Sequence, residues 1–87
     1  MFTVVEKRKV GKMLRKLPSE VQSLYRALLV DLAATGPEQP TWKNYSKLGG
    51  NRYHCHLGYR YAACWSYENK ILTVEVYYVG SRENAPY

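Results

Sequence analysis

The sequence predicts a small α+β fold in which an N-terminal helical hairpin packs on a small antiparallel β-sheet. Apolar residues in the first part of the chain recur at helical spacing, whereas those after residue 51 alternate with polar residues. Glycine and proline are concentrated between the two regions, as in a connecting loop. The chain has 87 residues, the length of one domain. We therefore expect residues 1–87 to form a single domain.

Residues 2–5 are apolar and β-branched and suit an edge strand. A helix is expected to follow, because Pro18 is preceded by apolar residues at the spacing of one helical face: Val10, Met13, Leu14 and Leu17. Proline does not fit a helix interior, so Pro18 ends this helix.

Ser19 begins a second predicted helix. Ser19 and Gln22 have the spacing of a capping box, and Gly36 followed by Pro37 is a helix-stop signal. The apolar face between these signals consists of Val21, Leu24, Tyr25, Leu28 and Leu32. The short connection at Pro18–Ser19 predicts that the two helices form an antiparallel hairpin.

Residues 37–50 are expected to form a loop in which Trp42 packs on the domain. Three strands should follow, at residues 52–57, 59–67 and 71–79, joined by short turns as an antiparallel meander.

Successive strand residues point to opposite faces of a sheet. The face toward the helices is expected to contain Tyr53, Cys55, Leu57, Tyr61, Ala63, Trp65, Tyr67, Leu72, Val74, Val76 and Tyr78. The other face should be open and polar, with Arg52, His54, His56, Arg60, Glu75 and Tyr77, and with Arg82 at its edge.

The chain is strongly basic. It has 13 Lys and Arg against 7 Asp and Glu, a formal net charge of +6 and a pI near 9.4. Such an excess favours binding to a polyanion such as nucleic acid, although it also serves solubility. Two cysteines, no signal peptide and no long apolar run predict a cytoplasmic protein without a membrane span.

Two imidazoles beside arginines suit phosphodiester cleavage in RNA. A base removes the 2′-hydroxyl proton, cations stabilise the phosphorane, and an acid protonates the leaving oxygen. We expect Arg60 and Arg82 to lower the pKa of His54 and His56, which would keep an imidazole neutral near pH 7. A solvated polar face is the alternative interpretation. Cys55 points to the opposite face, so a metal site is not expected, nor is a cofactor.

Two motifs follow the basic helices at characteristic positions: Gly58-Tyr59-Arg60 and Val79-Gly80-Ser81-Arg82. In this order and spacing the chain resembles the RelE/ParE toxin superfamily of bacterial toxin–antitoxin systems over essentially its whole length. The resemblance implies a RelE-like toxin, an endoribonuclease that cuts mRNA in the ribosomal A site and so inhibits translation. It also implies that the protein is a monomer when free and forms a complex with a cognate antitoxin.

The resemblance gives roles to individual residues. Arg60 matches a phosphate-stabilising arginine, and Arg82 matches an arginine that acts as leaving-group acid or charge stabiliser. Tyr87 matches a C-terminal tyrosine that stacks on the substrate base, and His54 and His56 lie where RelE has lysines. Further basic residues are expected to bind RNA: Lys12, Arg15, Lys43, Lys47 and Arg52.

Two other functions remain open. Some members of the superfamily, the ParE-like toxins, inhibit DNA gyrase, and the chain would also suit a non-catalytic RNA- or ribosome-binding module. The outward His, Arg and C-terminal Tyr favour the endoribonuclease.

Overall fold

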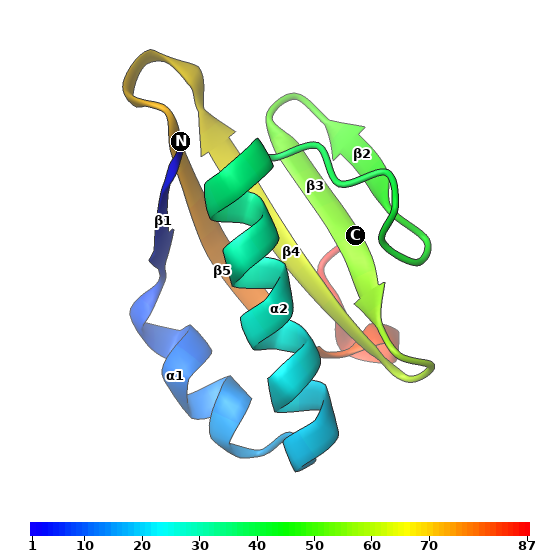
Figure 1. The fold of residues 1–87 in the computed structure, drawn as a ribbon. Helices are drawn as coiled ribbons and strands as arrows, with labels where there is room; N and C mark the ends of the chain where they lie inside the picture. Colours follow the sequence, from blue (N-terminus) through cyan, green and yellow to red (C-terminus); the bar gives the residue numbers. More distant parts are fainter.

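The computed structural model describes residues 1–87 as an α+β fold, as predicted (Figure 1). Its elements in chain order are β1 (Thr3–Glu6), α1 (Arg8–Arg15), α2 (Ser19–Thr35), β2 (Ser46–Gly49), β3 (Arg52–Leu57), β4 (Tyr61–Glu68) and β5 (Thr73–Ser81). Two short 3₁₀ turns, η1 (Asn69–Ile71) and η2 (Arg82–Asn84), flank β5.

The five strands form one sheet in the order β1-β5-β4-β3-β2. The three predicted meander strands are present as β3, β4 and β5, and they pair antiparallel. The sheet is nevertheless mixed, because β1 pairs parallel with β5, with Thr3 opposite Thr73. A strand of four residues has no pattern that encodes its direction, so the antiparallel prediction was wrong at this edge.

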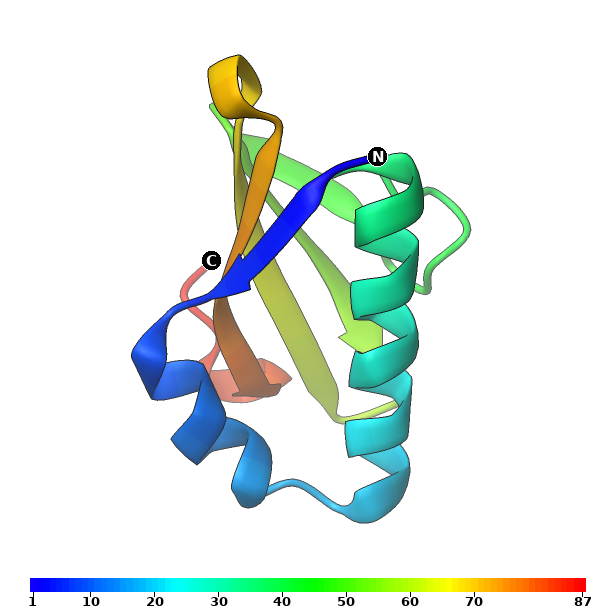
Figure 2. The same cartoon turned by 60° about the vertical axis from the view of Figure 1, so that its left-hand side comes forward.

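The helices lie in different places on the sheet. Figures 1 and 2 show α2 across one face and α1 beside the edge formed by β1 and β5. They diverge from Pro18 as an open hairpin. The predicted capping box does not form: Ser19 makes no side-chain cap, and Gln22 Nε2 instead donates to the Leu17 carbonyl at 2.9 Å.

The core lies between the sheet and the helices. Its buried residues are Val10, Leu17, Val21, Tyr25, Leu28, Leu32, Tyr53, Cys55, Leu57, Ala63, Trp65, Val74, Val76 and Val79. Trp65 is fully buried, and its Nε1 donates to the Pro37 carbonyl at 2.9 Å. This bond satisfies the one polar group that the indole brings into the core. Trp42 packs against the core, as predicted.

A β-bulge in β5 changes the predicted faces. Cys64 pairs with Tyr78, whereas the next residue, Trp65, pairs with Val76, so Tyr77 is the extra residue. The alternation therefore reverses after Tyr77. Val79 enters the core and Tyr78 lies on the opposite face, which corrects the inward position predicted for Tyr78.

β2 was not predicted. Its sequence Ser-Lys-Leu-Gly lacks the alternation of a strand, and the segment was expected to be part of a loop. It pairs antiparallel with β3 and places Ser46 opposite His54. This pairing covers what would otherwise be the free edge of the histidine-bearing strand.

Candidate active site

His54 and His56 lie side by side on the sheet face opposite α2. They are alternate residues of β3, and their ring centroids are 5.7 Å apart at an interplanar angle of 66°. Their shared face was predicted, but the face is less open than expected. Each histidine is only 8% exposed, because β2 and the C-terminal tail flank this part of the sheet.

His54 is held from two sides. Its Nδ1 lies 3.0 Å from the Ser46 hydroxyl, and its ring lies 4.2 Å from the ring of Tyr87. Burial lowers the pKa of His54, and the neighbouring His56 lowers it further, against a hydrogen bond to the Ser46 backbone that raises it. The imidazole is therefore neutral near pH 7.

His56 has cations as neighbours. Its backbone N–H donates to the Lys43 carbonyl at 2.8 Å, which fixes the 37–45 segment against β3. Burial lowers the pKa of His56, and the charges of Arg82 and Lys43 add to this effect. A neutral imidazole beside two cations can accept a proton while the cations stabilise an anion.

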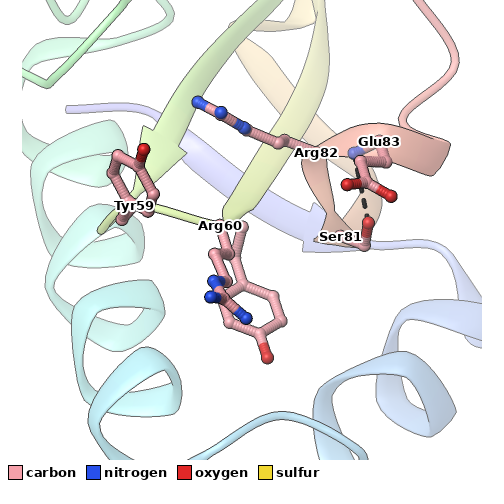
Figure 3. A pocket seen from close by; sticks show the side chains of 6 residues that line it. Tyr59, Arg60, Ser81, Arg82 and Glu83 are labelled. Carbon is pink, nitrogen blue, oxygen red and sulfur yellow. Dashed lines mark hydrogen bonds between the residues drawn. The ribbon is translucent and has the colours of Figure 1, made fainter.

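Arg82 and Arg60 border a cavity of about 490 Å³ whose lining is Tyr59, Arg60, Tyr61, Ser81, Arg82 and Glu83. The Arg82 backbone N–H donates to the Arg60 carbonyl at 2.9 Å, so the two backbones are adjacent. Their side chains diverge: Figure 3 shows the Arg82 guanidinium directed toward Tyr59 and the Arg60 guanidinium turned the other way.

Arg60 therefore does not join the histidines as predicted, and it is not among the charges that lower their pKa values. The physical reason is the start of β4. The strand was predicted to begin at Tyr59 but begins at Tyr61, so Arg60 lies in the turn and strand alternation does not direct its side chain. Arg60 also borders a second cavity beside Leu24 and Glu20 of α2.

Tyr59 belongs to this site and was not predicted as a site residue. Its ring is exposed, with the Arg82 guanidinium carbon 5.2 Å and Lys43 Nζ 5.9 Å from its centroid. Both are within the range of a cation–π contact. The available sequence signal was an aromatic residue directly after a predicted turn glycine, Gly58. In the structure Gly58 has a φ of +72°, as such a turn requires.

The residues predicted to bind RNA are dispersed. Lys43 joins the histidines, whereas Lys47 lies over the ring of Tyr53, which belongs to the core side of the sheet. Arg52 borders a separate shallow cavity with Glu75 and Tyr77. Lys12 and Arg15 are exposed on α1.

Glu75 is distant from His56. It pairs with Ser66, which pairs with Arg52, four residues from His56 along β3. Glu75 and His56 are therefore separated by roughly 13 Å along the strands, at about 3.3 Å per residue, and by roughly 10 Å across two strand spacings. Glu75 also forms an ion pair with Lys7 at 3.8 Å.

The structure holds no cluster of three or more potential metal-ligating side chains. Cys55 lies in the core, where it pairs with Ala63 across β3 and β4. Cys64 pairs with His54 and lies on the histidine face of the sheet. Both cysteines are free, and burial raises the pKa of each thiol to about 12. Neither thiol is suited to act as a nucleophile.

Neither helix is long and apolar enough to cross a membrane. No protein-family model and no curated protein sequence matches the chain. Solved structures do. The isolated RelE toxin of E. coli superposes with a TM-score of 0.77 at 21% identity, over 99% of this chain and 89% of that chain.

Two further structures extend the likeness. RelE in the archaeal RelE–RelB complex from Pyrococcus horikoshii OT3 gives a TM-score of 0.77 at 18% identity, over 97% of this chain and 98% of that chain. YoeB, solved as a dimer from Staphylococcus aureus, gives a TM-score of 0.74 at 7% identity, over 93% of this chain and 97% of that chain. The chain therefore has the fold of these RelE and YoeB toxin structures, the fold that the resemblance of its motifs implied.

Proposed function

We propose that this chain is the toxin of a type II toxin–antitoxin system and an endoribonuclease that cleaves mRNA in the ribosomal A site. The observation that carries the proposal is the pair of neutral imidazoles beside Arg82 and Lys43 on a RelE-like sheet. This arrangement combines a base with the positive charge that a phosphoryl transition state requires.

In the proposed reaction, His56 accepts the proton of the 2′-hydroxyl, whose oxygen attacks the adjacent phosphorus. The bond to the 5′-oxygen breaks and leaves a 2′,3′-cyclic phosphate, while the departing 5′-oxygen takes up a proton from water and becomes a hydroxyl. Arg82 stabilises the negative charge. Because a guanidinium stays protonated in proteins, we assign Arg82 to charge stabilisation instead of acid catalysis.

His54 and Tyr87 would position the substrate. Tyr87 lies over His54 and is half exposed, so its ring can move aside or stack on a base. Arg60, on the rim of the cavity, would contact a flanking phosphate.

The proposal includes a cognate antitoxin as partner, since a RelE structure of the same fold was solved as a complex with RelB. The free toxin would be a monomer. It would act in the cytoplasm, where its ribosome and mRNA substrate are.

The test is expression of the chain from a tightly controlled promoter, followed by mapping of mRNA 5′ ends. Cuts confined to translated messages are expected, and Arg82→Ala should abolish them. Arg26→Ala, an exposed arginine on α2, is the matched control and should cleave normally. Supercoiling arrest with intact mRNA would instead indicate gyrase inhibition, and translation arrest without cuts would indicate a non-catalytic binder.

A further inference from the structure

Tyr59 is an unusual aromatic residue in this chain because it is 70% exposed. It lies at the tip of the β3–β4 turn, and it borders both of the larger cavities. No hydrogen bond holds its hydroxyl. Its neighbours over the ring are Arg82 and Lys43, at 5.2 and 5.9 Å from the ring centroid. Most of an amphipathic, rigid ring is thus presented to solvent in a basic setting.

Tyr59 lies next to the histidine pair of the candidate active site. Figure 3 shows the Arg82 guanidinium directed toward the Tyr59 ring, and the charge of Arg82 also lowers the pKa of His56. Tyr59 itself follows His56 by three residues, just past the end of β3. Tyr87 lies on His54, at the other side of the pair. The histidine pair is therefore flanked by one exposed aromatic ring on each side.

We propose that Tyr59 is a nucleobase-stacking site for single-stranded RNA, on the side of His56 opposite to Tyr87. The site rests on the proposed RNA function and extends it: bases on both sides of the scissile phosphate would be held by aromatic rings. Every base has a π-face, and stacking on an exposed aromatic ring is a main source of affinity for single-stranded nucleic acid.

The surrounding charges favour RNA over a protein partner. Two cations, Lys43 and Arg82, lie over the Tyr59 ring, and Arg60 borders the same two cavities, against the carboxylates of Glu83 and Glu20 in their linings. Phosphates on either side of a stacked base would be neutralised by these cations. The cations are near the outer limit of cation–π distances, so they can move toward phosphates without losing a tight contact.

The experiment measures RNA binding without ribosomes and without cleavage. The probe is a fluorescein-labelled hexaribonucleotide with 2′-O-methyl groups, which block attack by the 2′-oxygen, together with versions that carry one abasic position. Tyr59→Leu should weaken binding of the intact probe at least fivefold, by about the loss of one stacked base. Tyr59→Trp should retain it. Ile71→Ala removes a side chain of similar exposure (65%) at the opposite end of β4 and should have no effect.

Coupling between ring and base is the decisive readout. One abasic position should weaken binding to the wild-type protein but not to Tyr59→Leu, because the partner ring is already absent. Equal affinities of wild type and Tyr59→Leu, a loss that no abasic position reproduces, or no detectable binding by the wild type would each overturn the proposal. Because no cleavage is involved, stacking at Tyr59 can hold or fail independently of the mRNA-cutting activity.

Discussion

The two histidines differ in their surroundings, and the difference predicts unequal catalytic roles. His56 lies beside Arg82 and Lys43, whereas His54 is held by Ser46 and covered by Tyr87. We expect His56→Gln to lower the single-turnover rate of mRNA cleavage on ribosomes by about 100-fold or more, the usual contribution of a general base. His54→Gln should lose less. Equal small losses would remove both imidazoles from proton transfer.

The pH dependence gives an independent check on His56. Because burial and the charges of Arg82 and Lys43 lower the pKa of His56 from its usual value of about 6.5, wild-type cleavage should fall with pH only below that value, as His56 becomes protonated. The residual activity of His56→Gln should lack this acidic limb. If cleavage by His56→Gln still fell at low pH, the acidic limb would have to come from the protonation of another group.

The lowered pKa values of the two histidines also make the free energy of unfolding depend on pH, and this effect has to be separated from the pH dependence of cleavage. Burial lowers the pKa of both histidines in the folded protein, so the unfolded chain binds protons more readily. The free energy of unfolding must therefore fall as pH drops through about 6.5. Circular dichroism at each pH separates a loss of the base from a loss of the fold.

Among the elements, the end of α2 depends on one glycine. Gly36 has φ +88° and ψ −162°, a conformation essentially confined to glycine, and a Cβ there would lie 2.7 Å from the Phe2 ring. Gly36→Ala should reduce the free energy of unfolding, measured by urea denaturation, by about 2 kcal/mol or more.

Gly11→Ala is the matched control for Gly36→Ala. Gly11 lies inside α1, and a Cβ there would meet nothing within 4 Å. Alanine is the better helix former, so this variant should gain about 0.5–1 kcal/mol. If the two substitutions changed the free energy of unfolding by similar amounts, Gly36 would not be required for its backbone conformation or its close approach to Phe2.

Elements with strong periodicity could be predicted from the sequence, and those set by pairing could not. The second helix was predicted to begin at Ser19 and the first meander strand to span Arg52–Leu57, and both bounds match the structure. β2 is visible only through its pairing with β3, and the bulge at Tyr77 only through its register with β4.

The candidate site shows the same division. The shared face of His54 and His56 follows from strand alternation, so it could be predicted. The directions of Arg60 and Tyr59 could not, because both lie in a turn where no periodicity applies. Nor could the covering of His54 by Tyr87, which depends on how the tail folds back.

At the scale of the whole molecule, the net charge of +6 is distributed over surfaces with different possible roles. Lys43 and Arg82 belong to the candidate site, whereas Lys12 and Arg15 lie on α1, at the β1–β5 edge of the sheet. Charge on α1 cannot assist the chemistry directly. It can increase affinity for ribosomal RNA by contacting phosphates and releasing their counterions.

The salt dependence of ribosome binding tests this role for α1. The logarithm of the association constant should fall linearly with the logarithm of salt concentration, with a slope of about −0.7 to −0.9 for each phosphate contacted. If Lys12 and Arg15 each contact a phosphate, the double variant Lys12→Ala/Arg15→Ala should show a slope shallower by about 1.5. Lys70→Ala, in the β4–β5 turn, controls for the loss of positive charge alone and should keep the wild-type slope. An unchanged slope in the double variant would show that Lys12 and Arg15 contact no phosphate and only solvate the helix. Any lower affinity at that unchanged slope would then reflect the smaller net charge alone.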